Sequence, residues 1–85
     1  MCNQKGEMIM NKTKVNFKNP DDVKNFVKTV EKYPYSMDMK RGRYIVDAKS
    51  LLGLMNLGLN KDIELDVYEE DCSDLFDAIK QYVAA

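Results

Sequence analysis

The alternation of Ile63, Leu65 and Val67 with acidic residues is the clearest periodic pattern in this sequence of 85 residues. Apolar residues two apart lie on the same side of a strand, so the segment predicts a strand with one buried face. An earlier segment has the period of a helix, with apolar residues at Val23, Phe26, Val27 and Val30. A chain with both patterns has to bury a strand face against a helix stripe, which indicates a mixed α and β domain.

The earlier helical segment has a marked start and a marked end. Asn19 is suited to cap the first free backbone N–H groups, and Pro20 needs no donor at the first helical position. The two acidic residues that follow, Asp21 and Asp22, suit the positive end of a helix. We expect this helix to stop near residues 33–34, because a proline disfavours helical conformation in the residue before it.

Shorter elements fill the rest of the chain. Alternation predicts strands over residues 12–17, 35–40 and 44–48, with a hairpin turn at 41–43. A short helix is expected over 50–57, ended by Gly58 in a left-handed conformation, and a last helix follows a cap at Asp71 or Ser73. The last helix is expected to bury four apolar residues: Leu75, Phe76, Ile79 and Val83.

The order β-α-β-β-α-β-α predicts an α+β fold, with a four-stranded antiparallel sheet that carries three helices on one face. We expect one domain over residues 12–85 after a flexible lead over residues 1–11, because the lead shows no clear period. A ferredoxin-like domain has a compatible order. The order of elements therefore does not settle the identity of the chain.

Composition excludes several classes of protein. The chain is 45% hydrophobic and 32% charged, which is ordinary for a folded soluble domain. It has no apolar run near the ~20 residues of a membrane span and no signal segment, so we expect a cytoplasmic protein. Two cysteines, Cys2 and Cys72, without any histidine predict neither a disulfide framework nor a metal site, and we expect no cofactor.

One segment in the second half of the chain carries a family resemblance. This segment resembles the regulatory-serine segment of HPr, the small carrier of the bacterial sugar phosphotransferase system. The residues that carry the resemblance are Asp47, Ala48, Lys49, Ser50, Leu51 and Leu52, followed by Asn56, Leu57, Gly58 and Leu59. Phe26 and Val27 fit the first helix of that family. The resemblance runs from about residue 23 to the end. It implies the family's open-faced β-sandwich, which has the element order predicted above.

The chain departs from the family where the family carries phosphate on a histidine. Aligned without gaps, Asn19 stands at the position of the phosphorylated histidine and Asp21 at that of the assisting arginine. A second alignment shortens this loop instead, and it also leaves no phosphorylatable nucleophile. An amide is not a usable nucleophile, and the acidic residues would repel a phosphoryl group. The residues themselves suggest a helix cap.

Ser50 corresponds in the resemblance to the regulatory serine that a dedicated kinase modifies. Two hypotheses stay open for it: a helix cap, which serine makes well anywhere, or a phosphorylation site with Lys49 beside it. The family binds its partners through an exposed apolar patch, which the resemblance places at Leu51, Leu52 and Met55. We expect Lys49 to take part in partner binding beside this patch. Two further apolar residues of this helix, Leu54 and Leu57, are expected in the core.

The leading hypothesis is a non-enzymatic regulatory or adaptor protein, similar to the histidine-less catabolite-repression paralogue of HPr. The partners that this resemblance implies are HPr kinase, a transcription regulator or phosphotransferase components. One alternative is a phosphocarrier that uses another residue. Another is a nucleic-acid-binding ferredoxin-like domain, suggested by the excess of Lys and Arg over residues 1–50. We do not expect nucleic-acid binding, because the strands lack the interleaved aromatic residues that stack bases, although Tyr35 and Tyr44 are available.

Overall fold

A computed structural model describes residues 11–84 of the chain, and its elements follow the predicted order. They are β1 (Asn11–Val15), α1 (Pro20–Val30), β2 (Met37–Arg41), β3 (Tyr44–Asp47), α2 (Leu51–Leu57), β4 (Ile63–Val67), α3 (Ser73–Ile79) and a single 3₁₀ turn, η1 (Lys80–Tyr82). The flexible lead predicted for residues 1–11 lies outside the described residues, except for Asn11, which begins β1.

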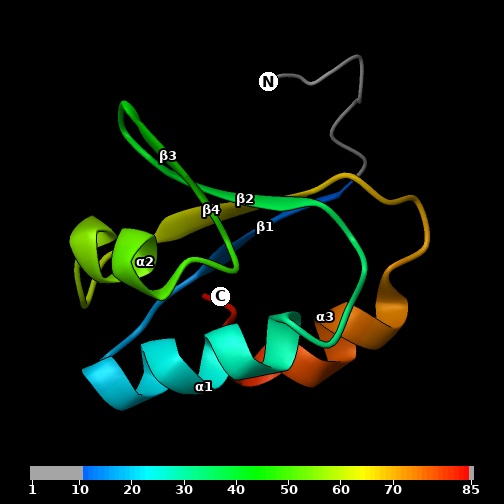
Figure 1. Cartoon of the computed structure of the whole chain (residues 1–85), viewed down its shortest axis with the longest axis horizontal. Helices are drawn as coiled ribbons and strands as arrows, with labels where there is room; N and C mark the ends of the chain where they lie inside the picture. The colour runs from blue at the N-terminus through cyan, green and yellow to red at the C-terminus, as the bar shows by residue number, and fades with distance from the viewer. Residues whose placement is uncertain (1–10, 85) are drawn as a thin grey trace.

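The strands form one antiparallel sheet in the order β1-β4-β2-β3. Helices α1, α2 and α3 cover one face of the sheet (Figure 1). The predicted α+β fold is therefore confirmed. The register pairs Val15 with Ile63 and Met39 with Leu65, so that the alternating apolar residues of neighbouring strands share the covered face.

The core lies between that face and the helices. From the sheet it takes Val15, Met37, Met39, Ile63, Leu65 and Val67, and from the helices it takes Val23, Phe26, Val27, Val30, Leu54, Leu57, Leu75 and Ile79. Three aromatic rings, those of Phe17, Phe26 and Tyr82, pack together in the core. Phe26 of α1 packs edge-on against Phe17, with centroids 5.1 Å apart, and against Tyr82, at 5.6 Å.

The last helix is shorter than the sequence predicted, and the expected burial of Val83 is wrong. Phe76, also expected in the core, is only partly buried against it. The helix ends at Ile79 and tightens into η1, after which Val83 forms a bridge with Val15 of β1. This bridge turns Val83 outward, with 38% of its surface exposed, and Tyr82 fills the core position instead. Two backbone hydrogen bonds hold the turn against β1: Asn16 N donates to Tyr82 O, and Ala84 N donates to Lys14 O.

Other predicted boundaries also differ. The N-cap of α3 is Cys72, without a side-chain cap hydrogen bond, so the predicted cap at Asp71 or Ser73 is wrong. Strands β1 and β2 cover Asn11–Val15 and Met37–Arg41 instead of residues 12–17 and 35–40.

Helix α1 stops at Val30, before the predicted end near residue 33, and a turn follows in which Tyr33 N donates to the Val30 carbonyl. Gly58 does have a positive φ of 99°, but its ψ of 165° is extended and not left-handed helical. The left-handed residue of that turn is Asn60, at φ 59°, whose N–H donates to Phe17 O.

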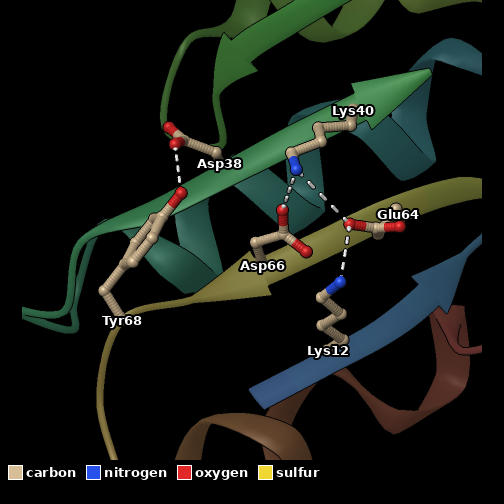
Figure 2. A network of polar contacts seen from close by, with 6 residues as sticks. All are labelled: Lys12, Asp38, Lys40, Glu64, Asp66 and Tyr68. Carbon is tan, nitrogen blue, oxygen red and sulfur yellow. Dashed lines mark hydrogen bonds and ion pairs between the residues drawn. The ribbon is translucent and has the colours of Figure 1, made fainter. Parts of the chain in front are cut away.

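The other face of the sheet carries charged side chains, and one of them is fully buried. Asp66 of β4 has no exposed surface, and its Oδ2 lies 3.0 Å from Lys40 Nζ (Figure 2). Lys40 Nζ also lies 3.8 Å from Glu64 Oε2, and Lys12 Nζ approaches the same oxygen at 4.0 Å. Close by, Tyr68 OH donates to Asp38 Oδ2 at 2.8 Å. Lysines from the basic first half thus pair with carboxylates from the acidic second half.

Burial shifts the pKa of Asp66, the central residue of this cluster. It raises the pKa of the Asp66 carboxyl above its ordinary value, with the adjacent Glu64 carboxyl as the second cause. The Asp66 carboxyl in turn lowers the pKa of Glu64, and its contact with Lys40 raises the pKa of that ammonium. The raised pKa of Asp66 means that its ionisation removes stability as the pH rises through that value. The lowered pKa of Glu64 works in the opposite direction, because the stability that it adds is lost as the pH falls.

We expect Asp66→Asn to gain stability relative to the native chain as the pH rises from 4 to 7, because the amide cannot ionise. Lys40→Met should lower the free energy of unfolding at pH 7 by about 1–3 kcal/mol, since it leaves a buried carboxylate without its cation. Urea unfolding of both variants at the two pH values measures these differences. Parallel pH curves for Asp66→Asn and the native chain would contradict the assignment.

Candidate functional site

The loop before α1 is a closed helix cap. Asn19 Oδ1 accepts a hydrogen bond from Asp22 N at 2.9 Å, and Asp22 Oδ2 accepts from Lys18 N at 3.1 Å. Pro20 is the first helical residue, and Asp21 is exposed in the first turn. The predicted cap is confirmed. The side chains of Asn19 and Asp22 both accept hydrogen bonds from backbone N–H groups, and the exposed side chain beside them, Asp21, is acidic.

A shallow polar depression of about 340 Å³ lies next to this cap. It is lined by Asn16, Lys18, Asp22, Asn25, Gln81 and Tyr82. The lining contains no serine, cysteine or histidine, and its one lysine is balanced by one aspartate. This arrangement offers neither a nucleophile in a reactive setting nor a surplus of positive charge for a phosphoryl group.

Ser50 is the N-cap residue of α2. Its Oγ accepts a hydrogen bond from Gly53 N at 3.2 Å, and its own N–H donates to Asp47 O. The side chain is half-buried. The first turn of α2 holds no acidic residue, so no carboxylate of the helix itself opposes a negative group at Ser50.

Helix α2 sorts its apolar residues between two environments. Leu54 and Leu57 are buried, as predicted. Leu52 is 79% exposed, while Met55 and Leu51 are 40% and 38% exposed. These three exposed residues are named the α2 patch here. An apolar cluster of this kind on a small domain is typical of a surface that binds another molecule, and the flexible methionine can adapt to different partners.

The Lys49 side chain points to the turn after α1, whereas the Ser50 side chain caps α2. Its Nζ donates to the carbonyl of Tyr33 at 2.8 Å, and the side chain is half-buried. The lysine thus ties the start of α2 to the turn after α1. Its ammonium is engaged in the structure and does not lie free beside Ser50.

Gly53 is a residue of this site that the sequence pattern did not indicate. A Cβ at this position would lie 3.0 Å from Val46 Cβ and 3.1 Å from Ser50 Oγ. The glycine therefore lets the backbone of α2 lie directly against β3. A glycine inside a helical pattern hints at such a close approach, but the partner of that approach cannot be read from the pattern.

Other reactive groups are poorly placed for chemistry. Burial raises the pKa of the Cys72 thiol, with the carboxylates of Asp71 and Asp74 as further causes, and Asn11 Nδ2 donates to its sulfur. Tyr35 OH donates to Asp74, and the Tyr35 ring stacks on that of Tyr33. Residues 11–84 hold no cluster of acidic, cysteine or histidine side chains fit for a metal ion. None of the helices in this range has the length and apolarity to cross a bilayer.

Comparison with known proteins connects this geometry to a family. Residues 22–85 match the family model described as "PTS HPr component phosphorylation site". The match begins after Asn19 and Asp21, so it does not test which family positions these two residues occupy. No curated protein matches the chain in sequence.

Solved structures with the same fold have low sequence identity to this chain. HPr-C-His from Thermoanaerobacter tengcongensis is 23% identical with a TM-score of 0.70, and the match covers 85% of this chain and 89% of that one. The phosphocarrier protein HPr from Bacillus anthracis str. Ames is 20% identical with a TM-score of 0.68, over 87% and 96% of the two chains. A histidine-containing phosphocarrier protein from Mycoplasma is 15% identical with a TM-score of 0.67, over 84% and 89%.

We expect Gly53→Ala to lower the free energy of unfolding by about 1 kcal/mol, although alanine favours helices, because the added methyl group is forced against Val46. Asn56→Ala is the matched control, since Asn56 is exposed on the same helix. There the gain in helix propensity should appear alone, as a small increase in stability. Thermal unfolding compares the two variants, and a stabilised Gly53→Ala would contradict the close approach.

Proposed function

We propose that this chain, which belongs to the HPr family, is a regulatory or adaptor protein of the phosphotransferase system and acts by docking on other proteins. Family membership rests on the match over residues 22–85. The proposal adds that the chain is not an enzyme, works in the cytoplasm and needs no cofactor. Its main support is one observation: an exposed apolar α2 patch lies directly beside a capping serine.

The lack of a usable nucleophile supports the adaptor role over the carrier role. None of the 85 residues is a histidine. Asn19 uses its side-chain oxygen to cap α1, and the adjoining residues Asp21 and Asp22 are acidic. A carboxylate could in principle accept a phosphoryl group, but nearby cations would have to stabilise the charge, and only Lys18 lines the depression there.

The α2 patch supports docking on a protein partner. Leu52 keeps most of its surface in water although the core lies directly beneath the helix. Burying a leucine of this exposure in an interface is worth about 1.5–3 kcal/mol, which is enough to dominate a small contact. HPr kinase and a transcription regulator are the partners that the family resemblance proposes. We place Lys49 at the margin of this surface, because its ammonium is held by the Tyr33 carbonyl.

Ser50 is the proposed point of control. A phosphate on its Oγ would bring nearly two negative charges to the margin of the α2 patch. The Ser50 Oγ bond to Gly53 N would then be replaced by bonds to phosphate oxygens, and α2 has no acidic first-turn residue to repel them. Such a charge would change which partners can approach Leu51 and Leu52.

Nucleic-acid binding receives no support from the aromatic residues. Tyr35 is stacked on Tyr33 and bonded to the carboxylate of Asp74, so its ring and hydroxyl are already engaged in an acidic setting. Tyr44 is exposed but is not joined by other aromatic residues of the sheet. A stacking platform would need several such rings on one face.

Phosphorylation is tested with HPr kinase and ATP, followed by intact-mass measurement. We expect one phosphate on the native chain, none on Ser50→Ala, and one on the control Ser36→Ala, which removes an exposed serine elsewhere in the chain. An unmodified native chain would exclude the serine switch. In a parallel reaction with phosphoenolpyruvate and the general phosphotransferase enzyme, an acid-labile adduct would contradict the adaptor role.

Docking is tested by the concentration dependence of the same kinase reaction. Leu52→Asp should raise KM roughly tenfold or more, because it removes the apolar contact and adds a charge. Asn56→Asp adds the same charge to an exposed polar position of α2 and should change KM little. Equal effects of the two variants would show that charge alone matters and that the α2 patch is not a docking surface.

A further inference from the structure

The two edge strands of the sheet, β1 and β3, differ in how far other segments cover them. β1 is the outer strand on one side, and the C-terminal segment covers part of its edge through the Val15–Val83 bridge and the hydrogen bonds from Asn16 N and Ala84 N. β3 is the outer strand on the other side, and within residues 11–84 it pairs only with β2. Figure 1 shows the β2–β3 hairpin projecting beyond the helices. An uncovered edge of this kind is a template for pairing with another strand.

The register of the hairpin fixes which backbone groups of β3 point outward. Arg41 pairs with Tyr44 across a loop of two residues, Gly42 and Arg43. Such a loop is closed by a hydrogen-bonded pair, and hydrogen-bonded pairs alternate along an antiparallel ladder. Tyr44 and Val46 therefore turn their backbone groups towards β2. Within β3, both backbone groups of Ile45 face the free edge, and so does the N–H of Asp47, whose carbonyl already accepts from Ser50 N. Arg43 is the turn residue directly before the strand.

The side chains of β3 are unusually apolar for an exposed edge. Ile45 is 60% exposed and Tyr44 is 68% exposed. Edge strands that avoid pairing are commonly very short or protected by charges, prolines or bulges, and β3 itself has four residues. The described residues of β3 have no proline, and their two flanking charges are of opposite sign, Arg43 on one side of Ile45 and Asp47 on the other.

From these observations we infer that two copies of this chain associate through β3, edge to edge and antiparallel about Ile45. In this register Ile45 lies opposite the partner subunit's Ile45, and the side chain of the turn residue Arg43 comes beside the partner subunit's Asp47. The two-fold axis repeats the ion pair on the other side. Opposite charges and aliphatic pairs facing each other across strands are the arrangement that stabilises a sheet, and the two four-stranded sheets become one of eight strands.

Charge selects this register over its neighbours. A two-fold axis at Tyr44 would place Arg43 opposite an isoleucine, and one at Val46 would place Asp47 there, so neither forms the ion pair. Within the subunit, Asp47 already lies opposite Asp38, a like-charged pair that is unfavourable across strands. Asp38 accepts a hydrogen bond from Tyr68 OH. Asp47 forms no ion pair within residues 11–84, and an arginine from the partner would supply a cation there.

The association should be weak, because only a short strand contributes to it. An interface of this length falls below about 1,200 Å² and belongs to the transient class. It is separate from the proposed docking role, since the α2 patch lies on the helical layer and β3 contributes its edge. The proposal therefore stands or fails independently of whether Ser50 is phosphorylated.

Sedimentation velocity of the full chain up to about 1 mM tests the pairing, a range suited to transient interfaces. We expect a monomer–dimer equilibrium in the native chain. Arg43→Asp and Asp47→Arg should each raise the dissociation constant about tenfold or more, because like charges then face each other twice per dimer. An equal mixture of the two variants should associate again, since each then meets the opposite charge. Circular dichroism checks that each variant is folded.

The controls separate self-pairing from other contacts. Ile45→Lys should abolish the dimer, and it carries the test alone if Asp47→Arg does not fold, because the Asp47 carboxylate also accepts a hydrogen bond from Lys49 N. Leu52→Asp should leave the dissociation constant unchanged. A native chain that stays monomeric would leave the edge to a strand of another protein and overturn the proposal. A variant mixture that fails to associate would overturn the register.

Discussion

The helices of this domain cover only one face of its four-stranded sheet, and most other features follow from that constraint. The covered face has to be apolar along every strand, which the alternation in β4 provides through Ile63, Leu65 and Val67. The residues between them face the other side. There the central position of β4 leaves Asp66 without exposed surface, so a charged group is buried on a face that has no helix above it. Lys40 and Glu64 accordingly gather around it.

The sequence predicted the elements well because their periods come from this one-sided burial. It predicted their ends less well, because ends depend on partners distant in the chain. Tyr82 and Val83 are both apolar enough for the core, and a continued helix would have buried Val83. The bridge to Val15 decides between them, and it lies 68 positions away in the chain. Likewise α1 ends at Val30, where the following turn brings the Tyr33 carbonyl to Lys49.

At the candidate site too, local features could be predicted from the sequence, and contacts between distant segments could not. The cap at Ser50 could be predicted because capping is local: a serine before an apolar run meets the N–H three residues on. The split between buried Leu54 and exposed Leu52 also follows from the period of the helix. The contact of Gly53 with Val46 could not be predicted, since it depends on how closely α2 lies against β3. The turn between β3 and α2 contains a hydrogen bond from Ser50 N to the carbonyl of Asp47.

The loop before α1 shows why this fold does not require a reactive residue there. Its contribution to stability comes from the hydrogen bond of the Asn19 cap, worth about 1 kcal/mol, and from Pro20 at the first helical position. The core residues Phe17 and Phe26 pack beneath this loop and contact Tyr82 without involving its exposed side chains. A residue that serves chemistry in this loop can therefore be exchanged for one that serves capping while the packing below is retained. Leu52 of α2 and Ile45 of β3 likewise lie on the surface without contributing to this packing.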